Sequence, residues 1–123
     1  MDPKTKELWI EALRSGQYKQ GRCRLRRQSD PYFGAHDSNW CCLGVLCDVV
    51  DPTKWIPPEA SKMGEIDWYQ YGSTGHDLAS ETLPSDLMAT VGLSAGLMSA
   101  LIVKNDTDGW NFDKIADWIQ ENL

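Results

Sequence analysis

Near the N-terminus, apolar residues recur at the spacing of a helix. Asp2 followed by Pro3 is typical of a helix start, because Asp caps the first turn and Pro suits the first helical position. Gly16 is a typical stop signal. The apolar face of the predicted helix consists of Leu8, Trp9, Ala12 and Leu13.

The next segment changes to the two-residue period of a strand. Within residues 17–27, Cys23 and Leu25 fall on one side, and arginines occupy the alternate positions. This pattern predicts a strand with an apolar face and an arginine face. Residues 28–39 are rich in Ser, Asp, Pro and Gly, so they are predicted to form a loop.

A short apolar run beginning at Cys41 predicts a central helix. The run C-C-L-G-V-L-C and the residues after it place Leu43, Leu46, Cys47 and Val50 on one buried face, and Asn39 is the expected N-cap. The helix should end before Pro52, because the residue preceding a proline disfavours the helical conformation.

In the C-terminal half, the pattern of apolar residues, Pro and Gly predicts one strand and two or three helices. Alternating apolar and aromatic residues indicate a strand over 65–71, and Pro84 and Gly92 bracket a short helix. Residues 97–102 suit either a short helix or a buried strand. Asn111 is the expected cap of a final helix, whose apolar stripe contains Phe112, Ile115, Ala116, Ile119 and Leu123.

These elements predict a small α+β domain that spans residues 1–123. We expect helices at both ends, a short antiparallel sheet and the central C-C-L-G-V-L-C helix. A chain of 123 residues has the size of one domain, and 41% hydrophobic and 24% charged residues are typical of a folded protein.

Charge and hydropathy restrict the class of function. Residues 1–27 carry eight Lys or Arg and three Asp or Glu, whereas residues 28–123 carry four and fifteen. An acidic majority argues against general nucleic-acid binding, which requires a positive surface field. We expect no membrane span and no export signal, because no apolar run is long enough and the first residues lack a signal-peptide pattern. The expected compartment is therefore the cytoplasm, with reduced cysteines.

The basic segment is the strongest candidate for a binding site. Alternate strand residues point to the same face, so Arg22, Arg24 and Arg26 should form a row of guanidinium groups. Such a row binds phosphates or carboxylates bidentately. The alternative is a solvated edge strand that resists aggregation. The candidate ligand contacts are Lys19, Gln20, Arg22, Arg24, Arg26, Trp68 and Tyr69.

The cysteines support a second hypothesis, a thiol-dependent enzyme. Cys41 or Cys42 would lie at a helix start, where backbone N–H groups stabilise a thiolate, with Gln20 as oxyanion donor and His76 as base. The spacing of the cysteines lacks the C-x-x-C pairs of zinc sites, so the sequence predicts no metal and no cofactor.

Three stretches resemble a widespread family of small uncharacterised proteins of tailed bacteriophages and prophages. They are W-I-E-A-L-R-S-G at 9–16, Y-K-Q-G at 18–21 and C-C-L-G-V-L-C-D at 41–48. The resemblance resumes more loosely in the C-terminal half, at Leu83-Pro84, Gly92-Leu93, Asn105-Asp106 and residues 112–117. The family usually has a small residue at the position of Cys23, and neither histidine belongs to its pattern.

The resemblance implies a phage accessory protein that acts inside an infected bacterium. Together with the arginines, it predicts a binding protein that captures an anionic ligand or an acidic host-protein surface. A nucleotide-derived host immune signal is one candidate ligand, since bases stack on aromatic rings. The alternatives are the cysteine enzyme and a structural or virion-associated protein.

Overall fold

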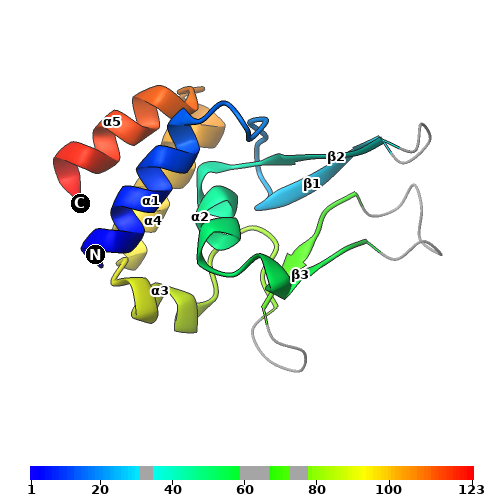
Figure 1. The fold of residues 1–123 in the computed structure, drawn as a ribbon, viewed down its shortest axis with the longest axis horizontal. Helices are drawn as coiled ribbons and strands as arrows, with labels where there is room; N and C mark the ends of the chain where they lie inside the picture. The colour runs from blue at the N-terminus through cyan, green and yellow to red at the C-terminus, as the bar shows by residue number, and fades with distance from the viewer. Residues whose placement is uncertain (31–34, 59–66, 73–77) are drawn as a thin grey trace.

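The computed structural model describes residues 1–30, 35–58, 67–72 and 78–123. In this part, the chain has five α-helices and two antiparallel sheets of two strands each, so it is a small α+β domain as the sequence predicts. Figure 1 shows the helices gathered at one end and the strands at the other. Helix α2 (Cys42–Val50) lies between them, and both termini lie at the helical end.

Helices α1 (Pro3–Arg14) and α5 (Phe112–Asn122) pack side by side (Figure 1). The predicted caps of both helices are confirmed. A side-chain oxygen of Asp2 accepts a hydrogen bond from the Thr5 amide at 2.9 Å. Asn111 accepts one from the Lys114 amide at 2.8 Å. Each bond satisfies an amide that the helix itself leaves unpaired, so the two starts are determined locally.

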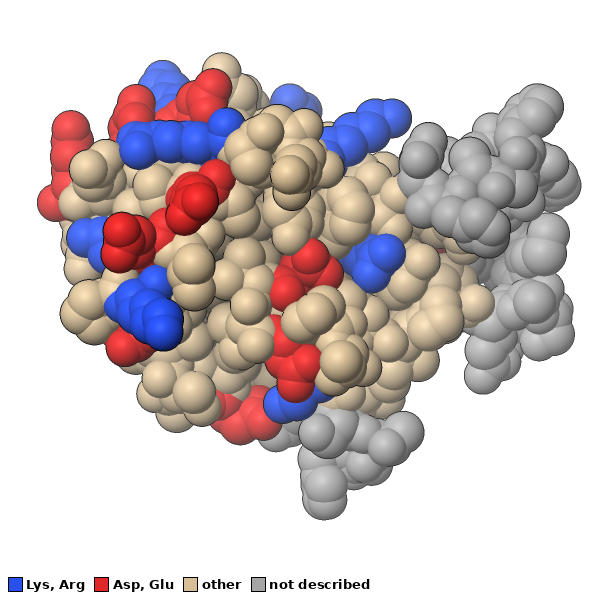
Figure 2. Space-filling model, in the orientation of Figure 1, with Lys and Arg blue, Asp and Glu red and all other residues tan. Residues whose placement is uncertain are grey.

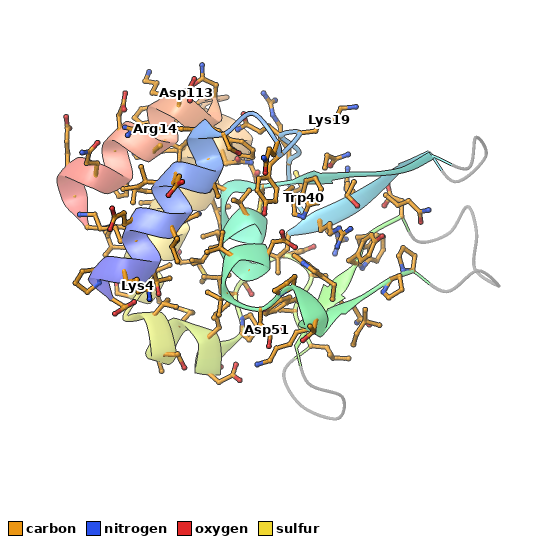
Figure 3. All side chains as sticks on the ribbon, in the orientation of Figure 1. Lys4, Arg14, Lys19, Trp40, Asp51 and Asp113 are labelled. Carbon is orange, nitrogen blue, oxygen red and sulfur yellow. The ribbon has the colours of Figure 1, made fainter. Side chains whose placement is uncertain are left out.

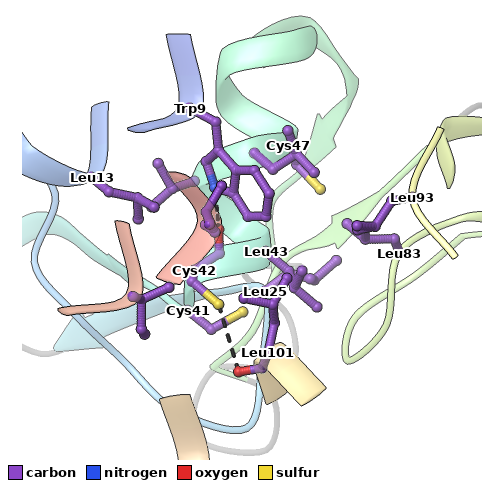
Figure 4. Close-up of a cluster of buried hydrophobic side chains, with 14 of the residues drawn as sticks. Trp9, Leu13, Leu25, Cys41, Cys42, Leu43, Cys47, Leu83, Leu93 and Leu101 are labelled. Carbon is purple, nitrogen blue, oxygen red and sulfur yellow. Dashed lines mark hydrogen bonds between the residues drawn. The ribbon is translucent and has the colours of Figure 1, made fainter. Parts of the chain in front are cut away.

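Helix α2 forms the centre of the core and is buried on all sides over its first six residues, Cys42 to Cys47. Helices α1 and α4 and strand β2 contact it, whereas Val50 at its end, predicted to be buried, is exposed. The Trp9 indole, fully buried, donates a hydrogen bond from Nε1 to the Cys42 carbonyl at 2.9 Å (Figure 4). The N-cap is Cys41, so the prediction of Asn39 as the cap is wrong, because Asn39 belongs to the preceding strand.

Strands β1 (Arg26–Asp30) and β2 (Ala35–Trp40) are antiparallel, with Arg26 opposite Trp40. Residues 67–69 pair with the other side of β1, where the Tyr69 amide donates to the Arg26 carbonyl at 2.8 Å. The chain then continues into β4 (Gln70–Tyr71), which pairs with β3 (Trp55–Ile56) after the short 3₁₀ turn η1 (Pro52–Lys54). The strands thus bring four aromatic side chains into one region: Trp40, Trp55, Tyr69 and Tyr71.

Two predictions for this region are wrong. The strand expected over 17–27 begins only at Arg26, and Cys23 adopts a left-handed backbone conformation with φ of 69°. The loop expected over 28–39 contains most of β1 and all of β2 except its last residue, Trp40. The physical reason is that strand pairing across the sheet satisfies the backbone of a polar segment whose composition alone favours a loop. Of the strand expected over 65–71, residues 65 and 66 lie outside the described residues.

In the C-terminal half, α3 (Ser85–Val91) starts after Pro84 and ends at Gly92, whose φ is 74°, as predicted. The ambiguous residues 97–102 are helical and belong to α4 (Ala95–Ile102). Helix α4 continues directly into a π-helical turn, η3 (Val103–Thr107). The turn directs Asn105 into the core, where its side chain is fully buried.

No single helix in the described ranges is long and apolar enough to cross a membrane. Helix α3 together with the α4–η3 segment meets the length and composition criteria, but the two parts are bent by 104° relative to each other.

Candidate functional site

The three arginines of the predicted row contact three different sets of residues. Arg22 is exposed and extends toward the turn at Gly109. Arg24 contacts Trp68, and Arg26 contacts three other aromatic rings. The row is therefore absent as a single face, because the regular strand starts only at Arg26 and the backbone turns at Cys23. The three positions have to be judged separately.

Arg26 lies in an aromatic cage, which we define as Trp40, Trp55 and Tyr69. Its guanidinium carbon is 4.1 Å from the ring centroid of Tyr69, 5.1 Å from that of Trp40 and 5.4 Å from that of Trp55. All three distances are within the range of a cation–π interaction. The Nε of Arg26 donates to the hydroxyl of Ser38 at 2.8 Å, and Ser38 is buried. The cage and this bond hold the guanidinium in one orientation.

A carboxylate adjoins this cage. Asp48, on α2, accepts a hydrogen bond from Trp55 Nε1 at 3.0 Å and another from the Tyr18 hydroxyl. Burial, followed by the bond to Asp48, raises the pKa of the Tyr18 hydroxyl to about 12, so it stays protonated and donates. The Tyr18 ring meets the Trp40 ring edge-on at a centroid distance of 5.0 Å.

Sequence reasoning missed Tyr18, Ser38, Trp40 and Asp48 as members of this site. Their positions along the chain show no common spacing, and they join only because α2, β1 and β2 converge. Figure 3 shows Trp40 where β2 runs into α2. The only signal available in the sequence was the high content of Trp and Tyr in a short chain.

Trp68 and Tyr69, both predicted ligand contacts, point to opposite faces of the sheet. Trp68 pairs with Arg27 and Tyr69 follows it, so their side chains alternate. Tyr69 belongs to the Arg26 cage, and Trp68 stacks under Arg24, whose guanidinium carbon is 3.9 Å from the ring centroid. Arg24 also pairs with Glu81 at 3.1 Å, so part of its charge is already neutralised.

Lys19 and Gln20 differ in their availability for a ligand. Lys19 is exposed and projects outward (Figure 3). Gln20 points inward and donates from Nε2 to the Asn105 side chain at 3.0 Å and to the Trp110 carbonyl at 2.7 Å. The amide donors of Gln20 are therefore used within the protein, and the residue connects the N-terminal segment to η3.

The thiols of α2 do not have the environment of a nucleophile. Cys41 is 6% exposed and Cys42 is fully buried. Burial raises the pKa of Cys41 to about 12, more than the neighbouring backbone N–H groups lower it, and it also raises the pKa of Cys42 and Cys47. The proposed base His76 lies outside the described residues.

We expect the native protein to expose a single reactive thiol. Cys23 is exposed, whereas the other three cysteines are buried. Titration with Ellman's reagent at pH 8 should label one thiol per chain rapidly, and four after unfolding in guanidinium, because buried protonated thiols react slowly. Cys23→Ser should remove the rapid reaction. Rapid labelling of Cys41 or Cys42 by iodoacetamide at pH 6 would instead support a cysteine enzyme.

The described surface combines both signs of charge. Figure 2 shows Lys and Arg side chains interspersed with Asp and Glu on the face that it presents. Among the described residues, no group of three or more His, Cys, Asp and Glu side chains is arranged to hold a metal ion. The Arg26 cage is therefore the best-defined candidate site in the described structure, and its chemistry is that of an oriented guanidinium.

No curated protein and no solved structure matches the chain. A family model described as a domain of unknown function, DUF8296, matches residues 1–123. The chain therefore belongs to the DUF8296 family.

Proposed function

We propose that this protein is a binding module that captures a small anionic ligand at the Arg26 cage. The observation that carries the proposal is the fixed guanidinium: Ser38 holds its Nε, and three half-buried aromatic rings surround it. The two ion pairs formed among the described residues involve Arg14 and Arg24, so neither uses Arg26.

The geometry suits an anion for two reasons. Among the described residues, the only hydrogen bond of the guanidinium is the one from Nε to Ser38, and the two Nη groups are the donors that can bind a carboxylate or phosphate side by side. The rings exclude water from the guanidinium faces, and a charge–charge contact is stronger where water is excluded. Because Ser38 and the three rings hold the guanidinium in one orientation, little ordering of the arginine is needed for binding.

The resemblance of the N-terminal half to small phage proteins suggests a setting for this activity. In that setting, the module acts as an accessory protein in the cytoplasm of an infected bacterium, and its ligand is a host metabolite or a nucleotide-derived signal. An acidic surface of a host protein could use the same guanidinium. The buried, protonated thiols of α2 make a cysteine-dependent reaction the weaker alternative.

Arg26→Gln should weaken ligand binding while the protein stays folded. Losing a hydrogen bond to a charged group costs about 1.5–3 kcal/mol, which corresponds to an affinity lower by about tenfold or more. A thermal-shift screen of phosphate, carboxylates, nucleotides and cyclic nucleotides should identify binders, and calorimetry should give their Kd. Arg26→Lys should bind more weakly than the wild type, because Lys lacks the planar fork.

Arg22→Gln is the matched control, since Arg22 belongs to the same segment but lies outside the cage. Its Kd should stay within about twofold of the wild-type value, a much smaller change than the loss of a hydrogen bond to a charged group would cause. If Arg22→Gln and Arg26→Gln reduce binding equally, the arginines act only through net charge. If no small anion binds and an acidic protein does so through Arg26, the ligand is a protein surface instead.

A further inference from the structure

Five side chains close a circuit of contacts, which we call the Arg26–Asp48 circuit: Tyr18, Arg26, Trp40, Asp48 and Trp55. On one side, the Trp55 ring lies 5.4 Å from the Arg26 guanidinium carbon, and its Nε1 donates to Asp48 at 3.0 Å. On the other side, Trp40 contacts Arg26, Tyr18 contacts Trp40, and the Tyr18 hydroxyl donates to Asp48. One cation and one carboxylate are thus joined through aromatic residues on both sides.

The two charges of the circuit are held apart. The ion pairs among the described residues are Arg14–Asp117 and Arg24–Glu81, so Arg26 and Asp48 do not approach within 4.0 Å of each other. All five residues are half-buried, so each keeps part of its surface exposed to solvent. The hydrogen bonds to Trp55 and Tyr18 fix Asp48, and the bond to Ser38 fixes Arg26. The separation is therefore built into the fold.

A carboxylate next to the cage limits which anions suit it. A ligand that carries only negative charge is attracted by Arg26 and repelled by Asp48. A ligand that also carries an ammonium group is attracted by both. Each oxygen of Asp48 accepts one bond from the protein and can accept another. The faces of Trp and Tyr rings attract ammonium groups as well.

We propose that the ligand of this site is a zwitterion of the amino-acid type, with its carboxylate on the Nη groups of Arg26 and its ammonium on Asp48. This inference rests on the proposed function and narrows its ligand class. The two charged groups of the ligand pair with Arg26 and Asp48, which do not pair with each other. Phosphates and nucleotides bind this site more weakly, since they supply no cationic group to pair with Asp48.

The test screens the twenty common free amino acids, inorganic phosphate and nucleotides by thermal shift at pH 7.5, and then measures Kd by calorimetry. The best amino acid is compared with its N-acetyl derivative, which lacks the ammonium, and with its amide, which lacks the carboxylate. Each derivative should bind about tenfold more weakly or worse, as expected for losing a hydrogen bond to a charged group.

Asp48→Asn tests the same contact from the protein side. Its amide oxygen can still accept the Trp55 bond, and its NH2 group can donate to the Tyr18 oxygen, so the circuit is kept with the Tyr18 bond reversed while the charge is removed. The variant should bind the free amino acid about tenfold more weakly and the N-acetyl derivative no more weakly than the wild type does. Asp51→Asn is the control, because Asp51 caps η1 outside the circuit. This variant should bind the free amino acid with the wild-type affinity.

The outcomes separate the two proposals. If the N-acetyl derivative binds as tightly as the free amino acid, or if phosphate or a nucleotide binds and no amino acid does, the zwitterion inference is wrong and the anion-binding function stands. If none of these compounds binds, both proposals are wrong. If an amino acid binds and Arg26→Gln has no effect on its affinity, binding occurs elsewhere, and both assignments to this site are wrong.

Discussion

Gly44→Ala, which adds one methyl group to α2, is expected to destabilise the protein strongly. A Cβ at Gly44 would lie 1.7 Å from the carbonyl oxygen of Leu25 and 2.6 Å from its carbonyl carbon. Both atoms belong to the backbone, so no side-chain rotation relieves the clash. The same carbonyl accepts a hydrogen bond from the Cys41 amide at 3.3 Å, which a displaced chain would lose.

The expected loss for Gly44→Ala is about 3 kcal/mol or more, at the upper end of what overpacking a core costs. That is a large part of the stability of a domain of this size. Chemical denaturation followed by tryptophan fluorescence measures the free energy of unfolding. A loss below about 1 kcal/mol would show that α2 and the Leu25 segment can separate without penalty.

Gly96→Ala is the matched control for this experiment. Gly96 is also helical, in α4, but a Cβ there meets no atom within 4 Å. Replacing Gly by Ala in a helix with open space should stabilise the protein, by about 0.5–1 kcal/mol. The two substitutions add the same methyl group to a helical glycine and should have opposite signs. The difference isolates the close packing of α2 against Leu25.

Asn105→Ala is expected to have the second-largest effect. The Asn105 side chain is fully buried in η3 and accepts hydrogen bonds from Gln20 Nε2 at 3.0 Å and from the Cys42 amide at 3.2 Å. It donates to the Gly21 carbonyl at 2.9 Å and to Asp106 at 2.8 Å. Asn105 thus ties the start of α2 and the basic segment to the C-terminal half.

Alanine at position 105 leaves the Cys42 amide and the Gly21 carbonyl without their side-chain partner. The expected loss of unfolding free energy is about 2–4 kcal/mol, since each buried group left unpaired costs about 1–3 kcal/mol. Asn122→Ala is the control, because Asn122 is exposed and bonds only to the Trp118 carbonyl one turn earlier. It should change the free energy by about 0.5 kcal/mol at most. Equal losses in the two variants would mean that water replaces Asn105.

The boundaries of α1, α3 and α5 were predictable because each depends on neighbours in the sequence. Asp2 bonds to the Thr5 amide and Asn111 to the Lys114 amide, both three residues away. The turn after α3 likewise depends on Gly92, whose φ of 74° suits a glycine. The apolar stripe of α5 also predicted its buried face, since Phe112, Ile115, Ala116 and Ile119 are all buried.

The strands were harder to predict because their partners lie far apart along the chain. Residues 28–39 are polar, and their local composition favours a loop, but β1 pairs with β2 on one side and with residues 67–69 on the other. The left-handed backbone at Cys23 also had no local signal, since non-glycine residues seldom adopt it. This turn separates Arg22 and Arg24 from the strand that carries Arg26.

By itself, the sequence determined the α+β class, the helix ends and the apolar core around α2, because these follow from local capping and from the spacing of apolar residues. It also contained the cation that the candidate site uses, Arg26. Only the tertiary structure decided what surrounds that cation. Trp40, Trp55 and Tyr69 contact it from β2, β3 and residues 67–69, and Asp48 on α2 accepts a hydrogen bond from Trp55. Such contacts depend on strand pairing and helix packing between distant segments, which no local pattern records.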